Sequence, residues 1–313
     1  MAVFTPVGDV EARNFLDAYD LGDLIALTPI AEGVENTNYA LQAGAGRFVL
    51  TLFEGRTDAA ALPFCLGLTD WLAQAGLPTA QPVRDRSGAW LGVLNGRSAA
   101  VVEWLNGAWP RDPSPVQAQA AGAMLARMHL SAADYPGRRA NPVGSAAWRA
   151  LAQRIATRVR GQGLDHDRAM LDRVEAALIE LGDPFTDDLP VGAVHADYFP
   201  DNVLFQGDAV SGVIDFYFAC TGPLAYDLAI ALSAWGFDGA GRPSPDILRA
   251  FRSGYDAIRP LSAAEAVALP RLGRAAALRF TLTRLHDRVF HDPSNLVTPK
   301  DPAAFLARLD YWR

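Results

Sequence analysis

The chain has 313 residues, a net charge of −7 and hydrophobic residues at 50% of its positions, as expected for a globular protein with one large or two smaller domains. The acidic balance argues against nucleic-acid binding. The sequence has no run of about 18 apolar residues, so no membrane-spanning helix is predicted. The first residues lack the basic and apolar segments of a secretory leader. Two distant cysteines in apolar surroundings, Cys65 and Cys220, are typical of buried thiols in a cytoplasmic protein.

The first third of the chain alternates short strand-like runs with helical segments. Apolar spacing predicts helices at 10–19 and 62–75, and strands at 25–30, 38–41, 48–53, 89–94 and 98–104. After residue 107 the pattern changes to long helices, predicted at 116–130, 146–159 and 167–181. We therefore predict an α+β protein with two lobes, 1–105 and 106–313.

The densest set of chemically useful side chains lies between residues 195 and 215. A short strand at 193–194 leads into a loop with Asp197 and Asn202, and strands at 203–205 and 210–215 then form a hairpin that ends at Asp215. Kinase-type phosphoryl transfer needs one carboxylate for the acceptor hydroxyl, and an amide oxygen with a second carboxylate for Mg²⁺. We predict Asp197 as the catalytic residue and Asn202 and Asp215 as the metal ligands.

Loop residues of this kind also have an ordinary use, because Asp and Asn often bond to their own main chain. A functional role is favoured by Asp215, which follows an apolar strand where an ionised carboxylate is costly without a cation or hydrogen bonds. We interpret His195 as a structural hydrogen-bonding residue. Asp227 is interpreted as a carboxylate that fixes the main chain of the loop.

These residues carry a family resemblance. The chain resembles the aminoglycoside phosphotransferase and choline kinase superfamily, whose loop reads roughly HGDxxxxN and whose second motif reads IDF or IDW. Within it the chain is similar to the bacterial homoserine kinases, at AEGVENTNY (31–39), FVLTLFE (48–54), HADYFPDN (195–202), IDFYFAC (214–220) and LVTPK (296–300). The likeness covers nearly the whole chain.

The resemblance implies a protein-kinase-like fold with ATP and Mg²⁺ as cofactors. The small, mostly β lobe at 1–105 would bind the nucleotide, and the large, mostly helical lobe at 106–313 would bind the substrate and carry the catalytic residue. Three residues depart from the superfamily pattern: Ala196 and Asp201 replace glycines, and Phe199 replaces histidine. The roles of Asp197 and Asn202 remain intact, but aminoglycoside or choline specificity does not carry over.

The nucleotide candidates lie in the first lobe. Backbone N–H groups and short side chains around a turn can reach phosphate oxygens, which makes candidates of Gly33, Asn36, Thr37 and Asn38. The alternative is an ordinary hairpin turn. Glu103 and Leu105 resemble the hinge where kinases present main-chain groups to adenine, with a plain strand end as the alternative.

The third predicted strand lacks the lysine that kinases use to contact the α- and β-phosphates. Thr51 stands at the matching position and is our candidate there, while the only lysine of the chain is Lys300. A P-loop is excluded because no Gly-Lys dipeptide exists. Arg47 or Arg56 could replace the missing charge, and either could equally be a solvated surface residue.

Two classes of function follow, a small-molecule kinase and a non-catalytic binding protein of the kinase fold. The missing lysine favours the second, whereas the retained Asp197, Asn202 and Asp215 favour the enzyme. Among possible acceptors, aminoglycosides are polycations and would call for an acidic cleft, to which the end of the chain often contributes. The last residues of this chain, 309–313, have little acidity. Choline would call for an aromatic cage around its cation. The candidates are Tyr217, Phe218, Tyr226, Trp235 and Phe237, although the sequence favours core packing for each of them.

Homoserine carries a carboxylate and would need an arginine. Arg279, Arg284 and Arg288 lie on a predicted helical stretch, and the sequence does not decide among them. L-Homoserine as the acceptor, with O-phospho-L-homoserine as a product on the route to threonine, is what the resemblance implies.

Overall fold

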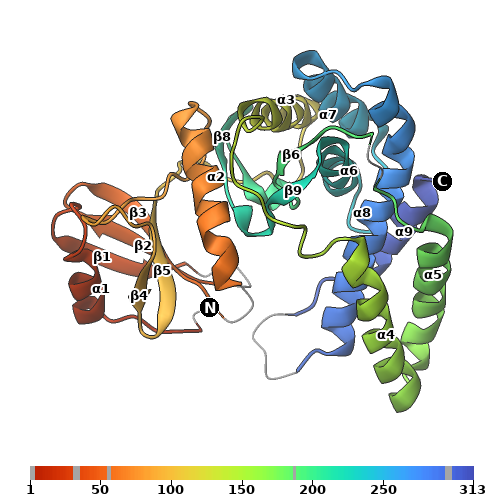
Figure 1. The fold of residues 1–313 in the computed structure, drawn as a ribbon, viewed down its shortest axis with the longest axis horizontal. Coiled ribbons are helices and arrows are strands. Elements are labelled where there is room, and N and C mark those ends of the chain that lie inside the picture. The colour runs from red at the N-terminus through yellow and green to blue at the C-terminus, as the bar shows by residue number, and fades with distance from the viewer. Residues whose placement is uncertain (1–3, 31–35, 55–57, 186–187, 293–297) are drawn as a thin grey trace. The chain divides into compact units, whose positions relative to one another are not determined.

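The chain folds into two compact units. The computed structural model describes residues 4–30, 36–54, 58–185, 188–292 and 298–313 (Figure 1). Unit 1 comprises Met1–Gly107 and Ser211–Tyr217, and unit 2 comprises Ala108–Val210 and Phe218–Arg313. The chain therefore returns briefly to unit 1 before it completes unit 2. Among the helices so described, none has the length and apolar character needed to cross a membrane.

Unit 1 is built on a five-stranded antiparallel sheet with the order β1-β2-β3-β5-β4. Its strands are β1 (Leu24–Pro29), β2 (Thr37–Ala43), β3 (Gly46–Leu52), β4 (Gly92–Leu94) and β5 (Arg97–Glu103). The helical elements are α1 (Asp9–Leu16), η1 (Ala59–Ala61) and α2 (Leu62–Gln74). Every second residue of β2 is buried, as expected for a strand with one face on the core.

Apolar side chains from α1 and from α2 pack into two separate clusters with strand residues. In the larger cluster, Phe15 and Leu16 of α1 pack with strand residues such as Leu50. In the smaller one, Leu62 and Leu66 of α2 pack with Phe53 and Ala100. Burial of these side chains, at about 1.5–3 kcal/mol each, is what stabilises the unit.

Unit 2 is mostly helical. Its helices are α3 (Pro115–Ser131), α4 (Ser145–Gln162), α5 (Asp165–Leu181), α6 (Leu224–Trp235), α7 (Pro245–Ile258), α8 (Ala263–Val289) and α9 (Ala303–Tyr311). Strand β6 (Val191–Val194) pairs antiparallel with β9 (Cys220–Pro223), and β7 (Val203–Gln206) pairs with β8 (Ala209–Val213). The 3₁₀ turns are η2 (Pro200–Asn202) and η3 (Phe216–Phe218). The end of β8 and most of η3 belong to unit 1, where the chain returns at Ser211–Tyr217.

Helices α3 and α7 approach each other through a pair of glycines. A Cβ on Gly122 would lie 2.0 Å from the carbonyl oxygen of Phe251, and a Cβ on Gly254 would lie 2.0 Å from that of Gln119. Real Cβ atoms essentially never come so close, so glycine is required at both positions. Because α3 and α7 also carry residues that support the loop with Asp197, this crossing helps to position that loop.

The α+β class predicted from the sequence is confirmed, and the predicted helices are observed with end shifts of a few residues. Strand β4 begins at Gly92, later than predicted. The strand predicted at 210–215 was too long: β8 ends at Val213, because Asp215 adopts a left-handed conformation with φ 65°. Cys65 and Cys220 are both free and buried, as predicted.

Candidate active site

The loop that follows β6 carries Asp197 and Asn202. Antiparallel pairing of Val194 with Cys220 on β9 holds its first end. Ala196 adopts φ 61°, in the left-handed region that costs a non-glycine residue about 1–2 kcal/mol. Of the three described non-glycine residues with positive φ, two are Ala196 and Asp215, and both lie in the predicted catalytic loops. Such strain persists only where the surroundings hold the backbone in place.

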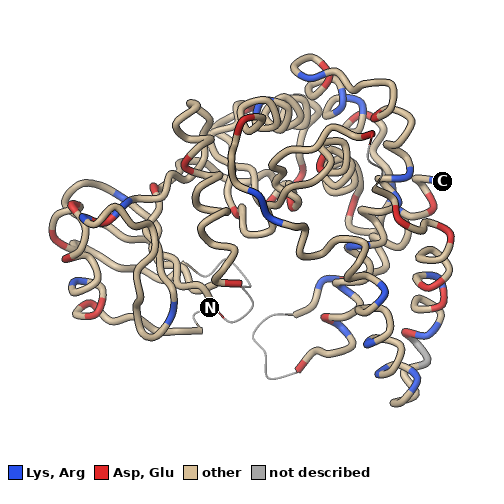
Figure 2. Tube along the Cα trace, in the orientation of Figure 1, with Lys and Arg blue, Asp and Glu red and all other residues tan. Residues whose placement is uncertain are grey.

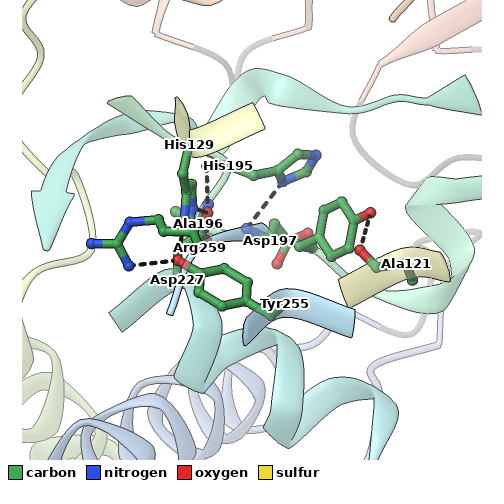
Figure 3. A network of polar contacts seen from close by, with 9 residues as sticks. Ala121, His129, His195, Ala196, Asp197, Asp227, Tyr255 and Arg259 are labelled. Atoms are coloured by element: carbon green, nitrogen blue, oxygen red, sulfur yellow. Dashed lines mark hydrogen bonds and ion pairs between the residues drawn. The ribbon is translucent and has the colours of Figure 1, made fainter. Parts of the chain in front are cut away.

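Asp227, from the first turn of α6, fixes this strained backbone (Figure 3). Its Oδ1 accepts a hydrogen bond from the main-chain N–H of Ala196 at 2.7 Å, and its Oδ2 accepts one from that of His195 at 2.9 Å. The loop-fixing role predicted for Asp227 is therefore confirmed. His195 also acts structurally, since its Nδ1 accepts a hydrogen bond from the main-chain N–H of Asp197 at 3.2 Å.

Asp227 is the first member of a buried network of hydrogen-bonded polar side chains. His129 Nε2 lies 3.0 Å from Asp227 Oδ2, and its Nδ1 lies 2.8 Å from the hydroxyl of Tyr255. Arg259 donates to that same hydroxyl at 2.9 Å (Figure 3). It also donates to Glu265 at 2.7 Å. Burial alone would raise the pKa of Asp227, but the hydrogen bond to His129, with the amides, holds it below the usual range. Asp227 is therefore a structural anion.

Asp197 and Asn202 contact each other across the loop. The amide nitrogen of Asn202 donates to the main-chain oxygen of Asp197 at 2.8 Å and lies 3.4 Å from its Oδ2. Among the residues that the structure describes, the side-chain carbonyl oxygen of Asn202 has no hydrogen-bond partner. Burial raises the pKa of Asp197 to about 6, although the positive charge of Arg279 opposes the rise. A carboxylate with a pKa near the working pH suits a general base.

Arg279 holds the loop from the side of α8. It is only 2% exposed, and its Nη1 donates to the main-chain oxygen of Ala196 at 2.5 Å. The other charges that shift the pKa of Asp197 come from Asp201, Lys300 and Arg284. Sequence reasoning named Arg279 and Arg284 without placing them. It missed the partners Tyr255, Arg259 and Glu265, for which no local signal exists.

Asp215 belongs to unit 1 and lies at the turn between β8 and η3. Its side chain is exposed, so the sequence argument that an unpaired carboxylate would be costly there was wrong in its premise. The carboxylate is therefore accessible from solvent. Among the residues that the structure describes, no group of three or more His, Cys, Asp or Glu gathers into a metal site.

The polar residues at the start of β2 are engaged with one another. Thr37 is fully buried; its hydroxyl donates to Glu54 at 2.7 Å and accepts from the main-chain N–H of Phe4 at 2.9 Å. Thr51 is 3% exposed and donates to the amide oxygen of Asn38 at 2.8 Å. Asn36 accepts a hydrogen bond from the main-chain N–H of Glu54 at 3.1 Å. These contacts hold the ends of β2 and β3 together.

Of the other candidates in the first lobe, some lie outside the described residues and the rest lie at or near the end of β5. Gly33 and Arg56 lie outside the described residues. Glu103 ends β5, and its main-chain N–H donates to Gln81 at 2.9 Å. Leu105 follows without a main-chain hydrogen bond to the described residues. Arg47 stacks its guanidinium on the Trp104 ring at 4.1 Å, beside this same segment.

Three of the aromatic residues considered for a choline cage lie in the core of unit 2. Tyr226, Trp235 and Phe237 are buried in unit 2, with at most 8% of each exposed. Tyr217 and Phe218 are consecutive and partly buried. The core-packing alternative therefore holds for the three buried residues.

Known proteins show which family the chain belongs to. Residues 26–261 match the sequence profile of the "Phosphotransferase enzyme family", so the chain belongs to that family. Solved structures of the same fold include a spectinomycin phosphotransferase in complex with ADP and spectinomycin, with a TM-score of 0.67 at 14% identity, covering 98% of this chain and 99% of that one. Another is an amicoumacin kinase in complex with AMP-PNP and Ca²⁺, with a TM-score of 0.68 at 17% identity, covering 97% and 92%.

Curated relatives along the full length are more specific. A homoserine kinase of Methylocella silvestris is 49% identical over 99% of this chain and 95% of its own length. Homoserine kinases of Nitrobacter hamburgensis and Methylorubrum populi are 46% and 47% identical, over 99% and 100% of this chain and 94% and 96% of their own lengths. Within the phosphotransferases, the chain is thus a kinase grouped with homoserine kinases.

Proposed function

We propose that the protein transfers the γ-phosphoryl group of ATP to the hydroxyl of L-homoserine, giving O-phospho-L-homoserine and ADP. The observation that carries the chemistry is the loop of unit 2, where Asn202 orients Asp197 and Asp227 fixes the strained backbone. The full-length likeness to homoserine kinases supports the choice of acceptor. A cytoplasmic location fits the two free, buried thiols.

Asp197 acts as the general base. Above its pKa of about 6 the carboxylate is ionised and can accept the proton of the acceptor hydroxyl as that oxygen attacks the γ-phosphate. Arg279 and Asp227 hold the main chain on either side of Ala196, so the carboxylate does not need to be ordered at the moment of reaction.

Asn202 and Asp215 are the proposed ligands of Mg²⁺. The side-chain carbonyl oxygen of Asn202 has no hydrogen-bond partner among the described residues, and the carboxylate of Asp215 is exposed. Both are hard oxygen donors, and Mg²⁺ usually takes one or two protein ligands besides phosphate oxygens. When bound, Mg²⁺ would neutralise negative charge on the β- and γ-phosphates. The residues present therefore fit the ion.

The nucleotide is proposed to bind through unit 1. We assign direct contacts to the turn with Gly33, Asn36 and Asn38 and to the main chain of Glu103 and Leu105. Because their hydroxyls are buried and already hydrogen bonded, Thr37 and Thr51 would shape this region from behind. No lysine is available there, so backbone N–H groups and the metal would carry most of the phosphate binding.

A coupled ADP-release assay tests the proposal. L-Homoserine, choline, ethanolamine, methylthioribose and an aminoglycoside are compared at equal concentration, and the product is identified by mass spectrometry. We expect clear preference for L-homoserine. Preference for choline or ethanolamine would reject the acceptor but keep the kinase. Nucleotide binding without transfer to any acceptor would support a non-catalytic binding protein.

A further inference from the structure

A cluster of three phenylalanines fastens helices α8 and α9 to the loop with Asp197. Phe199 lies in that loop, Phe280 on α8 and Phe305 on α9. Their ring centroids are 4.9 Å apart for Phe199 and Phe280, 4.9 Å for Phe280 and Phe305, and 6.0 Å for Phe199 and Phe305. A side chain placed on this phenylalanine cluster is therefore close to the catalytic loop.

Two arginines lie on the ring of Phe305. The guanidinium carbon of Arg284 is 4.4 Å from the ring centroid, and that of Arg308 is 3.9 Å from it. Burial, together with the like charge of Arg284, lowers the pKa of Arg308 to about 10. Partly desolvated positive groups are costly without an anion to balance them. Basic residues recur along α8, as Figure 2 shows in blue.

Two other arginines, Arg279 and Arg288, were considered for a substrate carboxylate. Both already contact other groups of the protein. Arg279 is buried against the main chain of Ala196. Arg288 forms ion pairs with Asp167 and, at 3.5 Å, with Asp301. The charge of Arg288 is therefore paired with carboxylates, and Arg279, at 2% exposed, is too buried to meet a ligand.

Arg284 differs from both. Within the described residues it pairs with no carboxylate, and its one hydrogen bond there runs from Nη1 to the main-chain oxygen of Asp301 at 3.2 Å. The guanidinium is half-buried, and its charge acts on Asp197. Lys300, whose Nζ lies 3.3 Å from Asp201 Oδ2, also acts on Asp197. Arg284 is thus a half-buried arginine that acts on Asp197 and pairs with no carboxylate of the described residues.

We propose that Arg284 binds the α-carboxylate of the acceptor and so selects an amino acid as substrate; this inference rests on the proposed function. A guanidinium matches a carboxylate with two parallel hydrogen bonds, and Phe305 beneath it limits competition from water. Choline, ethanolamine and aminoglycosides carry no carboxylate, so they gain nothing from this contact. Arg308 supports the site by adding positive charge beneath it.

The test compares L-homoserine with 3-amino-1-propanol, which is homoserine without its carboxylate. In Arg284→Met we expect kcat/KM for L-homoserine to fall by about 100-fold, mainly through KM, because charged hydrogen bonds are lost. The value for 3-amino-1-propanol, measured as turnover or as inhibition of homoserine phosphorylation, should change little. Arg284→Lys, which keeps the charge but loses the fork, should fall between the parent and Arg284→Met.

Arg274→Met is the matched control, since Arg274 lies on the same helix and pairs with the exposed Glu180 at 2.7 Å. It should leave both acceptors unaffected. Three results would overturn the inference: an unchanged KM for homoserine, an equal loss with both acceptors, or a raised KM for ATP instead. Failure of the proposed function is distinct, because the parent enzyme itself would then not phosphorylate homoserine.

Discussion

Unit 1 and unit 2 hold their candidate residues in opposite ways. In unit 2, the loop is fixed from outside by residues far away in sequence, which leaves the side chain of Asp197 free to react. In unit 1, Thr37 and Thr51, which the sequence predicted as nucleotide-binding residues, use their hydroxyls to hold β2 and β3 together. A group transfer needs one side chain in one place. Phosphate binding can instead rely on backbone N–H groups, which any sequence supplies.

The sharpest test of this difference is Asp197→Asn. Without a general base we expect the transfer rate to fall by about 10²–10⁴-fold. The fold should survive: the pKa of Asp197 is raised above its usual value, so its ionised form destabilises the native state as the pH rises through about 4 to 6. Thermal unfolding at pH 7 should therefore show equal or slightly higher stability. Near-normal turnover would remove Asp197 from the proposed role.

The pH dependence is the second prediction. Since the base must be ionised, kcat/KM should decline below a pH of about 6 and be roughly tenfold lower at pH 5 than at pH 7. Residual activity of Asp197→Asn should lack this acid limb. If the decline in activity at acid pH persists in Asp197→Asn, another titrating group causes it. The measurement is a pH profile at subsaturating homoserine.

Local patterns predicted much of this, because loops and amphipathic helices are encoded over a few residues. The role of His195 could be predicted because it lies within the motif, and that of Asp227 because a carboxylate often fixes the main chain of a loop. The polar chain behind Asp227 could not, since His129 meets Tyr255 across 126 residues of sequence and Asp227 across 98. Strand β9 was missed because its sequence, Cys-Thr-Gly-Pro, contains two residues that usually break strands.

Asp227→Asn asks how much the loop depends on its support. One amide would lose its acceptor and the hydrogen bond to His129 would weaken, at a cost of about 2–3 kcal/mol in unfolding free energy measured with urea, and kcat should fall. Because the pKa of Asp227 is held below its usual 3.8, the stability difference should shrink as the pH falls below that value.

Asp85→Asn in unit 1 is the matched control for that experiment. Asp85 Oδ1 also accepts two main-chain N–H groups, from Ser87 at 2.8 Å and Ala89 at 2.9 Å, but in a surface loop. Stability should change less and transfer should not change. Equal effects of the two variants on kcat would mean that Asp227 does not act on the loop specifically.

In unit 1, Thr51→Val tests the buried pair at the sheet end. Asn38 would lose its hydrogen-bond donor, and we expect a loss of about 1 kcal/mol in unfolding free energy. The KM for ATP should rise while that for homoserine stays constant, because Asn38 loses its fixed orientation. Thr28→Val, an exposed position on β1, is the control and should change neither. An unaltered KM for ATP would separate this pair from nucleotide binding.

The smallest effect is expected for Ala196→Gly. Glycine adopts the observed φ of 61° without the steric cost that alanine pays, but it also gains more freedom in the unfolded chain, so the net gain should be about 0–1 kcal/mol. Ala150→Gly, on the exposed face of α4, removes the same methyl group where φ is helical and should lose about 1 kcal/mol. If thermal unfolding shows that glycine stabilises the protein at position 196 but destabilises it at position 150, the backbone at Ala196 is strained. Unchanged kcat would show further that the contacts from Asp227 and Arg279, and not the methyl group, hold Asp197 in position.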